Sequence, residues 1–373
     1  MTVQVYMDHN ATSPTRSQVR EAVLRAMEAG GNPSSVHALG RKARRLVEDA
    51  REQVRKAVNA PKSAQVIFTS CGTEANTLAL TCTDRDQIWA GATDHSAVRT
   101  VREGIKLIPV NVNGLIDPFQ LEELFAGGGD DVVVSIMLAN NETGVLQQVE
   151  GIANIAHRYD ALVHTDAVQA LGKVPVDFQA LGVDMLSLSA HKIGGPLGVG
   201  ALIATKDVKI NAINPGGGQE NGVRGGTENV PGIVGFGLAA EIATAELDGM
   251  SKVKEMRDLL EAQIMAAAPD ATIIASLGDR LPNTSFVAMP GVDAETQVMT
   301  FDLEGICTSA GSACASGKTK ASAVLMAMGL DPAIASSAVR ISLAQTNTIE
   351  DIEHLLSAWT GLYQRKNKAK SAA

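Results

Sequence analysis

Hydrophobic and polar positions follow two different periods along this chain. Over 15–30 and 38–60, apolar residues recur every three to four positions, which predicts two amphipathic helices. Elsewhere, short apolar runs bounded by turn residues predict strands. We expect these strands at 66–70, 87–93, 132–139, 162–166 and 185–190. Because strands that are separated by helices usually align in parallel, residues 15 to 250 predict an α/β unit with a mostly parallel sheet.

The order of elements changes toward the carboxyl terminus. The stretch 233–268 has helical patterning, and strands are expected near 284–289 and 339–343. This order predicts a smaller α+β unit after the large one. With 373 residues, of which 45% are hydrophobic, the chain can bury one large core and a second, smaller one.

One lysine directly follows a predicted strand. Lys192 comes after the apolar run 185–190 and before the glycine-rich stretch 194–200. Proteins of the α/β class bind ligands at the carboxyl ends of their strands. Lysine is the usual residue for Schiff-base chemistry, because its amine loses a proton readily when desolvated or placed near cations. Lys192 is therefore a candidate for covalent chemistry, the alternative being a solvated lysine.

Polar residues also follow two other predicted strands. Asp166 can pair with the ring nitrogen of a pyridinium and make the ring an electron sink, and Gln169 can donate to a ring oxygen. The segment 69–73 offers amides and hydroxyls for a phosphate where a strand gives way to a helix, and Gly72 leaves room for it. The alternative for both places is ordinary helix capping.

A cysteine lies in a segment of small residues. Cys314 is the one thiol in the heptapeptide GSACASG (311–317), whose other residues are Gly, Ala and Ser, a composition typical of a loop and not of a core. A thiol on such a loop suits a nucleophile that moves. The alternative is a free cysteine in a glycine-rich turn.

Together, these segments and others resemble the class V aminotransferase family of pyridoxal-phosphate enzymes. Within that family, the resemblance is to the NifS/IscS-type cysteine desulfurases, and it covers nearly the whole chain. The motifs that carry it are MDHNAT (7–12), GNPSSVH (31–37), TSCGTEAN (69–76), DHSAV (94–98), NNETG (140–144), HTDAVQ (164–169), SAHK (189–192), GGGQENGVRGGTEN (216–229), GSACASG (311–317) and AVRISL (338–343).

The resemblance implies a role for each matching residue. Lys192 would hold pyridoxal 5'-phosphate as a Schiff base, Asp166 would pair with the pyridine nitrogen, and His95 would stack on the ring and relay protons. Asn141 and Gln169 would bind the phenolic oxygen. Contacts to the phosphate are implied for Gly72, Thr73, Ser189, His191 and, from a neighbouring subunit, Thr227.

The resemblance also implies the substrate site and the nucleophile. Asn32 and Arg340 would clamp the substrate carboxylate, for which the planar donor fork of arginine is suited. Cys314 would take sulfur from L-cysteine, leaving alanine and an enzyme persulfide. Two departures from the family pattern are Cys71, where a small residue is usual, and SLAQTN (342–347) after the arginine.

The fold and assembly implied by the resemblance are those of fold type I of the PLP-dependent transferases. We expect a large PLP-binding α/β domain over 15–255, a small α+β domain formed by 1–14 and 256–373, and a homodimer. The sulfur would pass to an iron–sulfur scaffold or another acceptor, such as a tRNA-thiolation enzyme. A selenocysteine lyase, another class V aminotransferase and an inactive sulfur-relay module are the alternatives.

Composition agrees with this interpretation. A net charge of −9 and a pI near 5.3 argue against sequence-independent binding to nucleic acid. We expect no signal peptide and no membrane span, and a cytoplasmic location. The four cysteines form no disulfide-like framework, and the spacing of His157, His164 and His354 predicts structural histidines, so we expect no metal site.

Overall fold

The computed structural model describes residues 4–129, 131–311 and 321–372. Its main sheet contains β2 (Gln65–Thr69), β3 (Gln87–Gly91), β4 (Lys106–Ile108), β5 (Val132–Met137), β6 (Leu162–Asp166), β7 (Met185–Ser189) and β8 (Gly200–Ala204). The strand order is β2-β8-β7-β6-β5-β3-β4. Of these strands, β8 alone runs against the others, pairing antiparallel with both β7 and β2. The predicted mostly parallel sheet is therefore confirmed.

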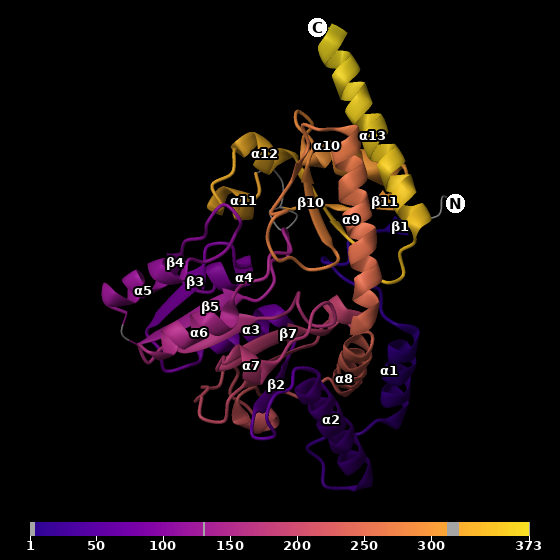
Figure 1. Ribbon diagram of the computed structural model, residues 1–373. Helices are drawn as coiled ribbons and strands as arrows, with labels where there is room; N and C mark the ends of the chain where they lie inside the picture. Colours follow the sequence, from indigo (N-terminus) through magenta and orange to yellow (C-terminus); the bar gives the residue numbers. More distant parts are fainter. Residues whose placement is uncertain (1–3, 130, 312–320, 373) are drawn as a thin grey trace.

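Helices cover both faces of this sheet (Figure 1). The covering helices are α1 (Ser17–Ala29), α2 (Ala38–Ala57), α3 (Gly72–Thr81), α4 (Ser96–Arg99), α5 (Pro118–Ala126), α6 (Val149–His157), α7 (Phe178–Leu181) and α8 (Val230–Ala245). Alternation along β5 shows how the layers form: Val132 and Val134 pack into the core beneath α2, α6 and α8, while Val133 packs into the core beneath α3.

A smaller antiparallel sheet lies beside the main one (Figure 1). It contains β12 (Ser309–Ala310), β13 (Ala338–Ser342), β10 (Thr284–Ala288) and β9 (Thr272–Ile273), in that order. Its helices are α9 (Met250–Ala267), α10 (Ala294–Leu303), α11 (Ala323–Ala327), α12 (Pro332–Ser337) and α13 (Ile349–Ala372). On β10, Val287 packs into the core with α9, α10 and α13, and its neighbour Phe286 packs into the core with α11 and α12.

The amino terminus returns to this smaller sheet. Strand β1 (Val5–Tyr6) pairs in parallel with β11 (Ile306–Cys307), and Asp8 bridges to Ser342 at the end of β13. The predicted domain boundary at residue 255 falls inside α9, which packs from Met250 onward with the smaller sheet. The chain starts in the smaller unit, builds the larger one and then returns, so that both units contact residues 5–12.

The sequence pattern located most elements to within a few residues. Two strands of the main sheet were not predicted. Strand β4 has only three residues, two of which are exposed, so it carries no apolar run. Strand β8 lies within a glycine-rich stretch, where Gly200 is needed because a Cβ there would lie 2.6 Å from the backbone carbon of Cys71.

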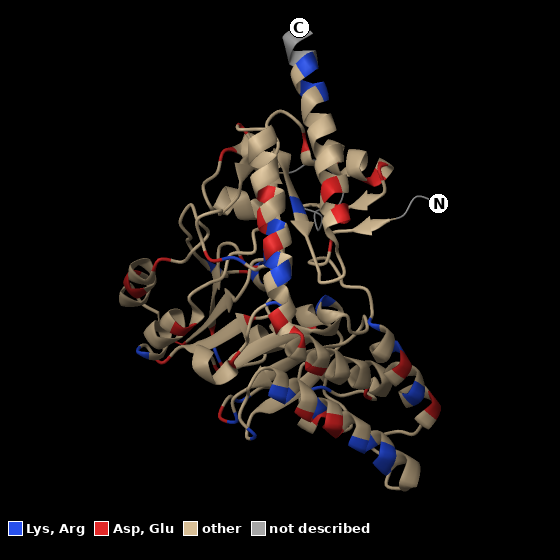
Figure 2. Ribbon diagram, turned by 45° about the vertical axis from the view of Figure 1, so that its right-hand side comes forward, with Lys and Arg blue, Asp and Glu red and all other residues tan. Residues whose placement is uncertain are grey.

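The long outer helices mix charges of both signs (Figure 2). On α2, Arg55 forms an ion pair with Glu52 at 2.6 Å, and on α9, Lys254 does so with Asp258 at 2.7 Å. Spacings of three and four residues place such pairs on one solvent-facing side of a helix. Among the described residues, no single helix has the length and apolar character to cross a membrane; α8 and α9 meet that criterion only jointly, across a bend of 56°.

Candidate active site

A cavity of about 260 Å³ lies where the parallel strands of the main sheet end. Asp166 is the last residue of β6 and Ser189 the last of β7, while Gly72 opens α3 just after β2. His95 follows β3 and caps α4. Parallel strands bring their carboxyl ends to one edge, so residues far apart in sequence meet there.

The structure brings most of the predicted site residues to this one cavity. Its lining includes Gly72, Thr73, His95, Asn141, Asp166, Gln169, Ser189, His191, Lys192 and Arg340. Asn32 and Thr227 do not line it: both lie on exposed segments of the chain, so one subunit alone does not bring them to the cavity. Cys314 lies outside the described residues, although Gly311, three positions before it, lines the cavity.

Lys192 reaches the cavity from a tight turn directly after β7. The turn is a short 3₁₀ helix, Ala190–Ile193, which Gly194 ends in the left-handed conformation at φ 75°. The Nζ of Lys192 donates hydrogen bonds to the backbone carbonyls of Asn10 at 2.6 Å and Ala11 at 2.7 Å. These contacts hold the amine at the cavity wall.

Asp166 is fixed by two donors and is almost fully buried. The side-chain Nδ2 of Asn76 donates to its Oδ2 at 2.7 Å, and the backbone N–H of Val168 donates to its Oδ1 at 3.0 Å. Each carboxylate oxygen has a second lone pair, so the group can still accept a hydrogen bond from a ligand. The arrangement suits a protonated ring nitrogen.

His95 is held as a neutral ring. Its Nδ1 accepts a hydrogen bond from the backbone N–H of Ala97 at 3.1 Å, so the proton of the neutral ring is on Nε2. Burial lowers the pKa of His95, the nearby cations Lys192 and Arg99 lower it further, and Asp166 opposes the shift. Burial and Lys192 likewise lower the pKa of His191, to about 4.

One side of the cavity is built to bind an anion. The Oγ of Ser189 is buried and has no hydrogen-bond partner among the described residues. Helix α3 begins beside it at Gly72, and its capping residue, Cys71, makes no side-chain capping bond. A Cβ at Gly72 would lie 2.9 Å from Cγ2 of Val168, so only glycine leaves this space open. A buried hydroxyl beside helix amides fits a phosphate group.

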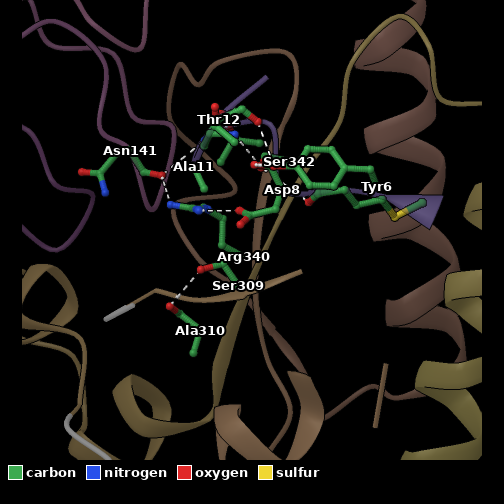
Figure 3. A network of polar contacts seen from close by, with 12 residues as sticks. Tyr6, Asp8, Ala11, Thr12, Asn141, Ser309, Ala310, Arg340 and Ser342 are labelled. Carbon is green, nitrogen blue, oxygen red and sulfur yellow. Dashed lines mark hydrogen bonds and ion pairs between the residues drawn. The ribbon is translucent and has the colours of Figure 1, made fainter. Parts of the chain in front are cut away.

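Arg340 enters the cavity from β13 of the smaller sheet (Figure 3). Its Nη2 donates to Oδ1 of Asp8 at 2.6 Å, and its Nη1 donates to the backbone carbonyl of Asn141 at 3.0 Å. The Nε is buried without a partner among the described residues. A guanidinium held in this way, with an unsatisfied N–H, suits a carboxylate ligand. The side chain of Asn141 extends away from Arg340.

Several residues around the cavity were not singled out from the sequence. Asn10 and Asn76 line it directly, and Lys173 lies behind Gln169. Glu142 is buried next to the site, where the Oγ of Ser322 donates to it at 2.5 Å and burial raises its pKa to about 7. Asn10, Asn76 and Glu142 belong to motifs that carried the family resemblance, and that was the only available signal.

Two of the remaining histidines, His164 and His157, take up structural positions. His164 is fully buried in β6, between the Oγ of Ser135 at 2.9 Å and the Oγ of Ser187 at 2.8 Å. His157 pairs with Asp184 at the surface. Within the described ranges, no group of three or more His, Cys, Asp or Glu side chains could hold a metal ion.

Comparison with known proteins identifies the family. The model of the Aminotransferase class-V family matches residues 5–355. A cysteine desulfurase from Cereibacter sphaeroides is 43% identical over 368 residues, which span 95% of this chain and 94% of that protein. The chain therefore belongs to the class-V aminotransferases. Within that family, it belongs to the group of cysteine desulfurases.

Solved structures agree with this grouping. A NifS-like protein from Rickettsia africae superposes with a TM-score of 0.91, at 38% identity and with 97% of this chain and 99% of that chain covered. SspA in complex with cysteine superposes with a TM-score of 0.77 at 28% identity, covering 92% of this chain and all of the other. Fold type I, the fold of the NifS-like enzymes, is therefore confirmed for this chain.

We predict that His164 makes the stability of the protein depend on pH. Burial lowers its pKa to about 3, whereas the unfolded chain binds this proton near pH 6.5. The unfolded state therefore takes up the proton as the pH falls below 6.5, and stability is lost. Between pH 7 and pH 5, this group should cost about 2 kcal/mol of unfolding free energy.

Urea denaturation of the wild type and His164→Asn at both pH values tests this. In the variant, the difference in unfolding free energy between pH 7 and pH 5 should shrink by about 2 kcal/mol. An unchanged pH dependence would contradict the prediction, whatever the absolute stability of the variant.

Proposed function

We propose that this enzyme uses pyridoxal 5'-phosphate to remove sulfur from L-cysteine and transfers it to its own Cys314. The observation that carries the proposal is the arrangement of Lys192, Asp166 and Ser189 around one cavity. It offers an amine, a carboxylate and an anion site at the carboxyl edge of the sheet. The membership in the cysteine desulfurase group supports the same reaction.

The lining residues fit the cofactor group by group. The unpartnered hydroxyl of Ser189 and the start of α3 would hold the phosphate, Asp166 would hold the ring nitrogen, and Lys192 would hold the aldehyde carbon. When bound, pyridoxal phosphate supplies an electrophilic carbon that condenses with amines and a ring that accepts electrons from the substrate. Gln169 would donate to the phenolic oxygen.

The protein side chains then bind the substrate and move its protons. Arg340 binds the carboxylate, because its guanidinium is held in place by Asp8 and keeps an unsatisfied Nε–H. The neutral ring of His95 and the amine of Lys192 both line the cavity, where each can take or return a proton. Lys192 exchanges the carbonyls of Asn10 and Ala11 for the reacting group.

Sulfur transfer balances without an external oxidant. The thiolate of Cys314 attacks the sulfur of L-cysteine, so that an S–S bond forms as the C–S bond breaks. The bonding electrons stay with carbon, which is protonated to give L-alanine, and the sulfur is left as a persulfide on Cys314. A reductant or an acceptor protein then removes this sulfur. For the acceptor, we propose an iron–sulfur scaffold or an enzyme of thio-cofactor or tRNA thiolation.

We also propose that the enzyme works as a homodimer. Thr227 and Asn32 match family motifs with roles in the site, yet both are exposed in the single chain and lie outside its cavity. A second copy that packs over these segments would bring Thr227 to the neighbouring phosphate. The exposed apolar side chains of Val36 and Leu39, close to Asn32, support contact with another subunit.

The proposed function predicts that Lys192 forms a covalent link to the cofactor. Wild-type protein incubated with pyridoxal phosphate should be yellow, and borohydride should fix the cofactor on a peptide that contains Lys192. Lys192→Ala should lose this link and all turnover, while the phosphate site can still retain the cofactor non-covalently. A link that persists in Lys192→Ala would contradict the assignment.

A second prediction separates the roles of the thiols of Cys71 and Cys314. Cys71 lines the cavity and is fixed between β2 and α3. The residues around Cys314 in the sequence are all small, a composition that we expect to let this thiol move. Cys314→Ser should keep the cofactor and lose sulfide release by at least about a hundredfold, roughly 3 kcal/mol of barrier. Cys71→Ser is the matched control and should keep most activity.

The position of the persulfide decides between these thiols. After a short incubation with L-cysteine, alkylation and mass spectrometry should find the extra sulfur on the peptide that contains Cys314. Extra sulfur on Cys71, with Cys314 unmodified, would overturn the assignment.

A further inference from the structure

A second lysine, which is buried, lies directly behind the cavity. Lys173 is 7% exposed and sits in the turns that follow β6. Its Nζ donates to Oε1 of Gln169 at 2.6 Å and to Oδ1 of Asn10 at 2.9 Å. Within the part of the chain that the structure describes, it makes no ion pair. Burial lowers its pKa well below the usual value, and the nearby charges of Lys192 and Arg340 act in the same direction.

The contacts of Lys173 fix which way the amide of Gln169 points. The nitrogen of that amide donates to the backbone carbonyl of Asn10 at 2.8 Å, and a carbonyl oxygen can only accept. The amide oxygen therefore faces the donor on Lys173. Both polar atoms of the amide are assigned by their neighbours, so the orientation is determined from two sides.

This orientation decides what Gln169 can offer to a ligand. An amide nitrogen carries two N–H groups, and the bond to Asn10 uses one of them. Gln169 lines the cavity, so the other N–H is available to an electron-rich oxygen of a ligand. Without a donor at position 173, the amide oxygen would be buried and unsatisfied, which costs about 1–3 kcal/mol and removes one of the two contacts that fix the amide's orientation.

We propose that Lys173 is a positioning residue, which holds the amide of Gln169 so that its nitrogen and not its oxygen meets the phenolic oxygen of the cofactor. This inference rests on the proposed function, because it concerns the same cofactor. The same amine also holds Asn10, whose backbone carbonyl accepts from Lys192 at 2.6 Å. Lys173 therefore holds both Gln169 and Asn10 in place, although it does not itself line the cavity.

The visible absorption band of the reconstituted enzyme provides the test. A hydrogen-bond donor stabilises the ionised form of the phenolic oxygen. When that donor is lost, the pKa that the absorption band reports rises, so the pH midpoint of the band should rise. For Lys173→Met, which fills a similar volume without a donor, we expect a rise of about half a pH unit or more, a threefold change in the dissociation constant. A midpoint equal to that of the wild type, with cofactor bound, would overturn the proposal.

A double-mutant cycle shows whether Lys173 acts through Gln169. Gln169→Ala should raise the midpoint at least as far, and adding Lys173→Met to it should change the midpoint no further. Equal shifts from Lys173→Met in both backgrounds would contradict a role through Gln169. Asn283→Ala is the matched control, because it removes the other donor to Oδ1 of Asn10 at 3.1 Å and should lower stability without moving the midpoint.

Lys173→Gln is the second variant, in case the apolar one does not fold. Its amide keeps a donor at this position, so its midpoint should stay closer to that of the wild type than to that of Gln169→Ala. A midpoint equal to that of Gln169→Ala would count against the proposal. Failure of the proposed function has a different signature: wild-type protein would then show no borohydride-reducible link to the cofactor.

Discussion

Asn10 is the residue at which the two sheets and the cavity are joined. It is 1% exposed, and its side chain uses both N–H groups and both lone pairs. The amide nitrogen donates to the backbone carbonyl of Asn141 and to Thr284, and the amide oxygen accepts from Lys173 and Asn283. A buried polar group with every position satisfied specifies one arrangement, because any shift leaves an unpaired atom.

The backbone of Asn10 extends the same role into the cavity. Its carbonyl accepts from both Lys192 and Gln169, and its N–H donates to Ser342 of β13. Partners from the main sheet and from the smaller sheet therefore meet on a single residue of the amino-terminal segment. The position of the reactive amine depends on how the two sheets are packed, and Arg340 is placed by the same packing through Asp8.

The sequence allowed some of this to be predicted. Asp166 and Lys192 end or follow short apolar strands, and parallel topology puts such residues at one edge, so their meeting followed from the pattern alone. The hydrogen bonds of Asn10 join positions 131 to 332 residues apart, and no local periodicity reports such contacts. Lys173 was missed for a related reason. Lysines are usually exposed to solvent, and the sequence alone does not show that this one is buried.

The charges around the cavity favour anionic ligands. Lys192, Lys173 and Arg340 bring basic groups to one region, and burial together with Lys192 lowers the pKa of both His95 and His191. Neutral imidazoles can take up protons, while the basic groups suit a phosphate and a carboxylate. In this site, different side chains therefore bind the anionic groups and transfer protons, as expected for an enzyme that acts on an amino acid.

The central claim is that this site breaks the C–S bond of L-cysteine and leaves alanine. The most direct measurement is to incubate the protein, loaded with pyridoxal phosphate, with L-cysteine and a reducing thiol, and to quantify sulfide and alanine over time. The account predicts equal amounts of the two products over many turnovers. Consumption of L-cysteine to a keto acid, with neither sulfide nor alanine formed, would contradict it.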